Sequence, residues 1–208
     1  MSSRGILITL EGNEGCGKST QIHLLYDWLK KEGKKVFQTR EPGGTAIGDQ
    51  IRAILLSPKN DLSPLTETFL YMASRSQLVA EVVKPHLLKG EIVLCDRWLD
   101  ATVAYQGYAG GVEVKWIQTL GKIATQGVLP ALSLYLDLPV KIGLKRISKR
   151  SSADRIEKKS ILFHEKVREG FLAIASQEPK RFKRLAIFEQ DSIAVIHERI
   201  QKEVERVL

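Results

Sequence analysis

Cysteine is scarce in this chain, with only Cys16 and Cys95 among 208 residues. Their spacing matches neither a zinc site nor a disulfide framework, so we expect neither. Unpaired cysteines of this kind are typical of proteins from a reducing cytoplasm. Cys16 falls within a glycine-rich loop, where it is either a redox-sensitive thiol or a small residue that fits the loop.

Long apolar runs are also lacking. No stretch approaches the length that spans a membrane, and the first residues lack the apolar segment of a secretory signal peptide. The chain shows no internal repeat, no low-complexity tract and no Pro/Gly-rich linker. We therefore expect no membrane partner and a single domain over residues 1–208.

Acidic residues are the minority among the charged side chains, with 24 Asp and Glu against 32 Lys and Arg, which gives a formal charge of +8. Such an excess suits nucleic acid, anionic lipid or polyphosphate ligands. The densest basic stretches, 141–159 and 180–184, are not interleaved with aromatic residues in the manner of a nucleic-acid surface. A nucleotide phosphate site explains the charge better than nucleic acid does.

What the chain does contain is a complete phosphate-binding loop. Gly12, Gly17, Lys18 and Ser19 meet the pattern G-x-x-x-x-G-K-[ST], between an apolar strand and a segment with helical spacing. Glycines let backbone N–H groups turn toward phosphate oxygens, and the lysine reaches the β- and γ-phosphates. We expect ATP or GTP to be bound by Gly12, Asn13, Glu14, Gly15, Cys16, Gly17, Lys18, Ser19 and Thr20.

Strands and helices alternate along the chain. The apolar runs predict five strands at Ile6–Leu10, Lys35–Thr39, Glu91–Cys95, Leu132–Leu136 and Arg184–Phe188. Helical patterns lie near 18–32, 46–56, 64–84, 112–126, 139–149, 157–176 and 192–207. The alternation predicts an α/β fold, a three-layer sandwich around a five-stranded parallel sheet. Ligands in such folds bind at the carboxyl ends of the strands, where the motifs of this chain fall.

Asp96 and Arg97 follow the third predicted strand. An acid at this position usually holds Mg²⁺ together with the phosphate-loop hydroxyl, here Ser19. The alternative for Asp96 is a helix N-cap, and Arg97 either grips a phosphate or neutralises Asp96. Tyr105 and Gln106 are expected near the same strand end.

Two further groups suit a nucleotide ligand. Tyr71 and Arg75 stand four residues apart on a predicted helix, so the ring can stack on a base while the guanidinium holds a phosphate. A core tyrosine beside a surface arginine is the alternative. The basic segment 146–157 reads either as a lid that closes over phosphates or as a solvated loop.

Together with the phosphate loop, Arg40-Glu41-Pro42-Gly43-Gly44-Thr45, the Asp96–Gly107 block and Asp154-Arg155-Ile156-Glu157 resemble bacterial thymidylate kinase, a P-loop nucleoside monophosphate kinase, across almost the whole chain. The resemblance implies transfer of the ATP γ-phosphoryl group to dTMP with Mg²⁺, usually in a homodimer. It also implies the substrate-binding residues Glu14, Arg40, Tyr71, Arg75, Arg97, Thr102, Tyr105 and Gln106.

The resemblance further implies individual roles for these residues. Arg75 and Arg97 hold the dTMP phosphate, and Arg40 lines the same pocket. Tyr71 stacks on thymine where the family usually has phenylalanine, and Thr102 bonds the base edge. Tyr105 lies against the deoxyribose C2′, and Glu14 engages the 3′-hydroxyl.

Two positions depart from the family pattern. Ala101 replaces a serine, and the loop has Gly15 and Cys16 where the eukaryote-type enzyme carries an arginine. The transition-state arginine is therefore expected from the lid, as Arg150 or Arg155, with Lys18 and Arg97 as the other catalytic residues.

Three alternative functions fit parts of the sequence. A kinase of the same fold could act on UMP, CMP or AMP, although Thr102 and Tyr105 argue against it. A GTPase-type regulator would carry Asn-Lys-x-Asp after a buried strand, which Pro58-Lys59-Asn60-Asp61 does not match. A non-catalytic scaffold would have no need of Lys18 and Asp96.

Overall fold

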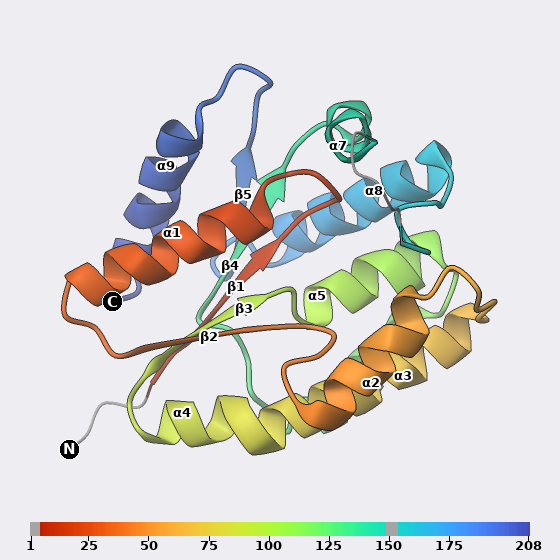
Figure 1. Ribbon diagram of the computed structural model, residues 1–208, viewed down its shortest axis with the longest axis horizontal. Coiled ribbons are helices and arrows are strands. Elements are labelled where there is room, and N and C mark those ends of the chain that lie inside the picture. Colours follow the sequence, from red (N-terminus) through yellow and green to blue (C-terminus); the bar gives the residue numbers. More distant parts are fainter. Residues whose placement is uncertain (1–4, 149–153) are drawn as a thin grey trace.

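A five-stranded parallel sheet forms the centre of the computed structural model, which describes residues 5–148 and 154–208 (Figure 1). The strand order is β2-β3-β1-β4-β5. All neighbouring strands of this sheet are parallel, as the sequence predicts. The strands are β1 (Leu7–Glu11), β2 (Val36–Arg40), β3 (Ile92–Asp96), β4 (Leu132–Asp137) and β5 (Phe182–Ala186).

The first four strands lie within one residue of their predicted bounds, whereas β5 begins two residues before its predicted start at Arg184. The predicted run counted the apolar residues up to Phe188, but that side chain is exposed. Phe182 instead enters the sheet, where its ring lies 5.9 Å from that of Tyr135. Burial of an aromatic ring thus sets the start of this edge strand.

Helices cover both faces of the sheet (Figure 1). They are α1 (Lys18–Lys31), α2 (Ala46–Leu56), α3 (Pro64–Leu78), α4 (Lys84–Leu88), α5 (Leu99–Thr102), α6 (Val114–Ala124), α7 (Val140–Ile147), α8 (Ile161–Gln177) and α9 (Ile193–Glu205). A π-helical segment, Val79–Val83, joins α3 to α4, and a second, Val103–Ala109, continues α5. Several starts follow from capping. For example, the Thr45 hydroxyl accepts a bond from the Gly48 N–H at the start of α2.

The prediction of helices from the sequence was wrong for residues 99–109 and for the start of α8. It missed the helical segment 99–109, because those residues are buried around much of their circumference and show no polar face. It also began a helix at 157, whereas α8 begins at Ile161 behind the Ser160 cap. Asp154 closes a turn instead, since its Oδ1 accepts the N–H groups of Ile156 and Glu157 at 2.8 Å each.

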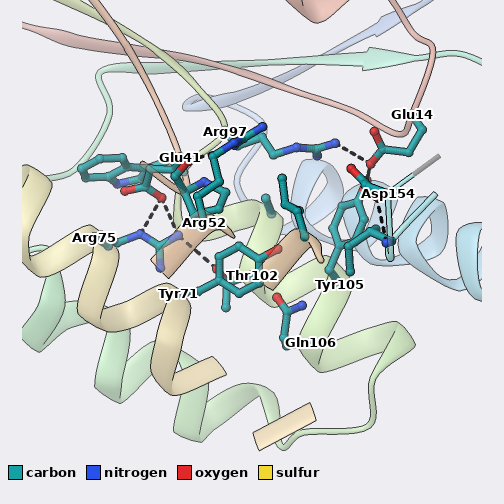
Figure 2. Close-up of a pocket in the computed structure, with 15 residues that line it drawn as sticks. Glu14, Glu41, Arg52, Tyr71, Arg75, Arg97, Thr102, Tyr105, Gln106 and Asp154 are labelled. Carbon is teal, nitrogen blue, oxygen red and sulfur yellow. Dashed lines mark hydrogen bonds and ion pairs between the residues drawn. The ribbon is translucent and has the colours of Figure 1, made fainter. Parts of the chain in front are cut away.

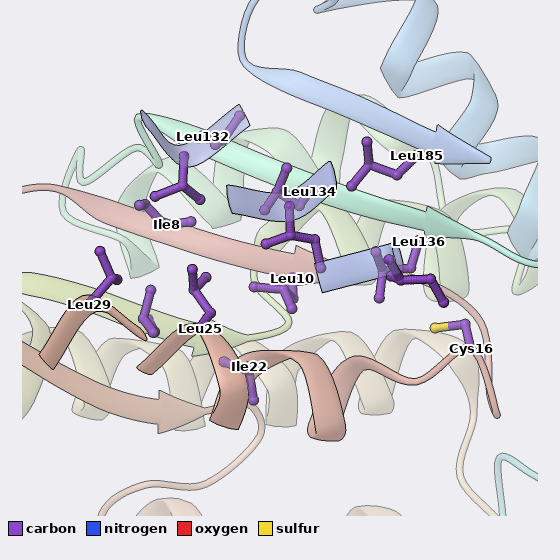
Figure 3. Close-up of a cluster of buried hydrophobic side chains, with 14 of the residues drawn as sticks. Ile8, Leu10, Cys16, Ile22, Leu25, Leu29, Leu132, Leu134, Leu136 and Leu185 are labelled. Carbon is purple, nitrogen blue, oxygen red and sulfur yellow. The ribbon is translucent and has the colours of Figure 1, made fainter. Parts of the chain in front are cut away.

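Alternate side chains of the strands point to opposite faces of the sheet and pack into two apolar layers. Ile8 and Leu10 of β1 pack with Ile22, Leu25 and other residues of α1 and α9 on one face (Figure 3). On the other face β-strand residues pack against the helical segments α3 to α5 and α8. Because both faces are covered, the inner strands read as continuous apolar runs.

The carboxyl ends of β1, β2 and β3 lie at one edge of the sheet, since Leu10 and Arg40 both pair with Asp96. The three motif-bearing loops leave from this edge, as the sequence predicts. Elsewhere, the described part of the chain holds no helix long and apolar enough to cross a membrane.

Candidate active site

The phosphate loop is closely packed where it leaves β1. A Cβ on Gly12 would lie 2.8 Å from the Leu136 carbonyl, and one on Gly15 would lie 2.3 Å from the Gly143 carbonyl. Both glycines also have positive φ values, 148° and 72°. Gly17 begins α1 with no side-chain cap, so the first N–H groups of the helix are left for a ligand.

Lys18 folds back over this loop. Its Nζ donates to the carbonyls of Gly12 at 2.9 Å and Asn13 at 3.1 Å. Cys16 is buried in the core below, which agrees with its interpretation as a small packing residue. Beside the loop lies a cavity whose other wall comes from Arg146, Ile147, Asp191, Ile193 and Ile196. We call it the donor cavity.

The Ser19 hydroxyl and the Asp96 carboxylate meet at the mouth of the loop, 3.4 Å apart. Asp96 caps no helix, because α5 begins three residues later behind Trp98. Hydroxyl and carboxylate oxygens suit Mg²⁺. Within residues 5–148 and 154–208, no group of three or more His, Cys, Asp and Glu could hold a metal alone, so any ion here needs further oxygens from its ligand.

A second cavity, the acceptor pocket, opens between the sheet edge and α3 (Figure 2). Its walls come from six segments of the chain. It is lined by Glu14, Glu41, Pro42, Arg52, Leu56, Tyr71, Arg75, Arg97, Trp98, Ala101, Thr102, Tyr105, Gln106, Asp154 and Ile156. Most substrate-binding residues expected from the sequence are therefore brought together here.

Arg75 is the most deeply buried cation of this pocket. Its Nε and Nη2 both donate to one oxygen of Glu41, at 2.8 and 2.6 Å, and Nη2 also donates to Thr102 at 3.0 Å. Both charged side chains are almost inaccessible to solvent. Glu41 thus already balances the charge of Arg75 before any substrate binds.

Arg97 joins the two cavities. Its Nη2 donates to Glu14 at 2.7 Å, its Nη1 donates to the Gly12 carbonyl at 2.9 Å, and its guanidinium lies over the Tyr105 ring. The Tyr105 hydroxyl donates to the same Glu14 oxygen at 2.7 Å. Arg97 also has a φ of 73°, a conformation that is rare outside glycine and common at functional sites.

These contacts set the charge of Glu14, which lines both cavities. Burial alone would raise the pKa of its carboxyl, but Arg97 and Lys18 outweigh burial and lower that pKa to about 2. Burial raises the pKa of Tyr71 to about 12, so its ring stays neutral. The pocket therefore offers a fixed anion beside the loop and a neutral ring opposite.

Two expected residues lie elsewhere. Arg40 does not line the acceptor pocket: its side chain is more than half exposed, 3.7 Å from Asp49, and lies along a neighbouring groove with Ser19 and Asp96. Arg155 is buried and bonded to Glu67 and, through Nε at 2.8 Å, to the Leu55 carbonyl. Arg150 lies outside the described residues.

The sequence did not single out several lining residues, among them Arg52, Trp98 and Asp191, and Arg146 was expected only as part of the lid segment 146–157. Arg52 donates to the Pro42 carbonyl at 2.9 Å and brings a cation to the acceptor pocket. Its position seven residues after Thr45, two helical turns along α2, was the signal available for it. Asp191 and its neighbours follow β5 in a stretch without any motif.

Comparison with known proteins agrees with this geometry. Residues 10–200 match the family model described as thymidylate kinase. A thymidylate kinase of Geobacter sp. (strain M21) is 51% identical over 185 residues, covering 86% of this chain and 82% of that protein. One of Geotalea daltonii is 52% identical over 186 residues, with 86% and 87% covered.

The solved structures give the same result at the level of the fold. The crystal structure of thymidylate kinase from Ehrlichia chaffeensis superposes with a TM-score of 0.78 at 30% identity, covering 96% of this chain and 98% of that one. With the phosphate loop, the acceptor pocket and the fold in agreement, the chain belongs to the thymidylate kinase family, whose members use ATP to phosphorylate dTMP to dTDP.

Proposed function

We propose that ATP binds in the donor cavity, dTMP binds in the acceptor pocket, and the γ-phosphoryl group passes between them beside Arg97. The observation that carries this assignment is the Arg97–Glu14 pair, because Glu14 lines both cavities and Arg97 also bonds the phosphate loop. Two nucleotides bound on either side of this pair have their phosphates directed to the same place.

On the donor side, the backbone N–H groups of residues 12–20 and the Lys18 ammonium hold the ATP phosphates. Lys18 exchanges its bonds to the Gly12 and Asn13 carbonyls for phosphate oxygens. The adenine then lies toward Ile193 and Arg146 on the opposite wall. Transfer needs no strong base, since the acceptor is already an anion, and positioning with charge neutralisation dominates.

Ser19 and Asp96 are the residues that would hold Mg²⁺, with phosphate oxygens completing its ligands. An ion bound there would supply charge neutralisation to the ATP phosphates. Removal of Mg²⁺ with EDTA should abolish turnover.

On the acceptor side, Tyr71 stacks on thymine, and Thr102 and Gln106 contact the base edge. Tyr105 lies against the deoxyribose, where its hydroxyl is held by Glu14. Arg97 and Arg52 face the dTMP phosphate. Because Glu41 balances its charge, Arg75 is better suited to the neutral base than to the dTMP phosphate, the role that the family resemblance implies for it.

The transition-state arginine is proposed to come from the lid. Arg155 reaches the phosphates only by leaving its bonds to Glu67 and Leu55. Arg150 is the other candidate. Arg40 lies along the groove beside Asp96 and would reach the dTMP phosphate only from outside the acceptor pocket.

A homodimer through α2 and α3 is also part of the proposal. Ile47, Ile54, Leu65 and Phe69 on these helices are exposed by 41 to 52%, and a partner would cover them. Replacing Phe69 with Glu should convert a dimer to a monomer in analytical ultracentrifugation, and a wild type that is already monomeric would contradict this part.

The assignment is tested by an ADP-release assay with ATP, Mg²⁺ and separate dTMP, dUMP, UMP, CMP and AMP acceptors. We expect the highest kcat/KM with dTMP. Turnover with another monophosphate and none with dTMP would overturn the substrate assignment.

A further inference from the structure

Glu67 on α3 is a buried carboxylate outside the acceptor pocket that accepts hydrogen bonds from two distant segments of the chain. One oxygen accepts from Nη1 of Arg155, 88 residues away. The other accepts from Nε2 of Gln106, 39 residues away, at 3.0 Å. Glu67 is only 6% exposed, so solvent does not compete for these bonds.

This contact determines which end of the Gln106 amide faces the pocket. A primary amide has a donor end, Nε2, and an acceptor end, Oε1, whereas a carboxylate only accepts. The reversed amide would set two acceptor oxygens about 3 Å apart in a buried site, which is unfavourable. Gln106 lines the acceptor pocket together with Tyr71 and is drawn below it in Figure 2. Its carbonyl Oε1 is therefore the end left for a ligand.

Arg155 holds the Glu67 carboxylate in place and so maintains the orientation of the Gln106 amide. A guanidinium donates and never accepts, and Arg155 is itself held by its Nε bond to the Leu55 carbonyl at 2.8 Å. Its backbone N–H also donates to the Leu56 carbonyl, at 3.2 Å. Arg155, at the end of the lid segment, thus fixes one oxygen of Glu67, and the other oxygen remains to accept from Gln106.

We propose that Glu67 is a positioning residue for substrate selection: it holds the Gln106 amide with its oxygen toward the base and so selects pyrimidines that carry hydrogen at N3. Thymine and uracil donate from N3, whereas N3 of cytosine is an acceptor that would face the Gln106 oxygen. The inference rests on the proposed placement of the dTMP base beside Gln106.

Glu67→Gln tests this because it reverses the direction of the hydrogen bond between residue 67 and Gln106. Arg155 retains the new amide oxygen, so the new NH₂ faces Gln106, which must then present its own oxygen to it and its NH₂ to the pocket. We expect kcat/KM for dTMP to fall about tenfold or more, and the dTMP-to-dCMP ratio of kcat/KM to fall further, by about 100-fold. An unchanged ratio in a folded variant would overturn the inference.

Glu81→Gln is the matched control. Glu81 lies on the continuation of the same helix and accepts from Gln77 at an exposed position, so the same chemical change there should leave the ratio unaltered. The wild type serves as the second control: if it fails to phosphorylate dTMP, the proposed function fails, and this outcome is separate from an unchanged ratio in Glu67→Gln.

A second variant covers loss of folding by Glu67→Gln. Replacing Glu67 and Arg155 together with Met exchanges a buried ion pair for an apolar pair, a change that is often tolerated. The Gln106 amide is then free to turn. Because Arg155 is also a candidate in the chemistry, binding is measured by calorimetry: the dTMP-to-dCMP affinity ratio should fall about tenfold or more, and a ratio equal to that of the wild type would contradict the role of Glu67.

Discussion

The donor and acceptor halves of the site are built in different ways. The donor half comes mainly from one continuous stretch, residues 12–20, whose backbone geometry is fixed by glycines packed against other carbonyls. The acceptor half collects side chains from six segments, and several of its charged groups already bond one another, as in the Glu41–Arg75 and Glu14–Arg97 pairs.

The difference indicates a division of labour. The donor half presents backbone N–H groups and one lysine that bonds backbone carbonyls of the loop, which suits any nucleoside triphosphate. The acceptor half holds fixed donors and acceptors in a buried pocket, which suits one base and one sugar. We therefore expect changes in the donor half to affect turnover most, and changes in the acceptor half to affect substrate affinity and protein stability.

The largest effect is expected from Lys18→Ala. Loss of the ammonium beside the γ-phosphate should lower kcat by about 10³-fold or more, measured by ADP release. Lys31→Ala, an exposed change on the same helix, is the control. Near-normal turnover of Lys18→Ala would refute the role of the loop.

The lid variants sharpen the comparison, because the Arg155 backbone N–H donates to the carbonyl of Leu56, which lines the acceptor pocket. If Arg150 is the transition-state arginine, Arg150→Ala should lower kcat by about 10²-fold or more while the KM for dTMP changes little. Arg155→Ala should instead raise the KM for dTMP, since it frees Glu67. If kcat falls in neither variant by more than the KM for dTMP rises, the lid assignment is wrong.

Glu41→Ala tests how far the acceptor half depends on its buried ion pair. The change leaves Arg75 charged and buried, so the free energy of unfolding should fall by about 3–5 kcal/mol, which corresponds to a Tm about 6–20 °C lower for a chain of this size. Arg40→Ala breaks the exposed pair with Asp49 and should cost no more than about 1 kcal/mol. Equal losses in the two variants would contradict the ranking.

The smallest effect concerns pH. The pKa of Glu14 is lowered to about 2 by Arg97 and Lys18 against the opposing effect of burial, so its ionised form stabilises the fold above about pH 4.5. That stabilisation is lost as the pH falls toward about 2. In urea unfolding, Glu14→Gln should destabilise the protein more at pH 7 than at pH 2.5. An equal difference at both values would show that this pKa is not lowered.

The sequence predicts the features that come from one continuous stretch of the chain better than those that depend on contacts between distant residues. The phosphate loop and the buried strands are local patterns, and the structure confirms the sheet. The Arg75–Glu41 pair and the Arg155–Glu67 pair join residues 34 and 88 positions apart, which no local pattern shows. The helix over 99–109 was missed because its buried side chains conceal the helical period.

The most direct test of the division between the two halves is the affinity of dTMP for Lys18→Ala and for Arg97→Ala, measured by calorimetry without ATP. We predict that Lys18→Ala binds dTMP within about twofold of the wild type although it has lost turnover. Arg97→Ala removes a partly buried cation and leaves Glu14 without its ion-pair partner, so it should bind dTMP about 30-fold or more weakly. Equal losses of affinity in the two variants would contradict the account, because they would place Lys18 in the acceptor half.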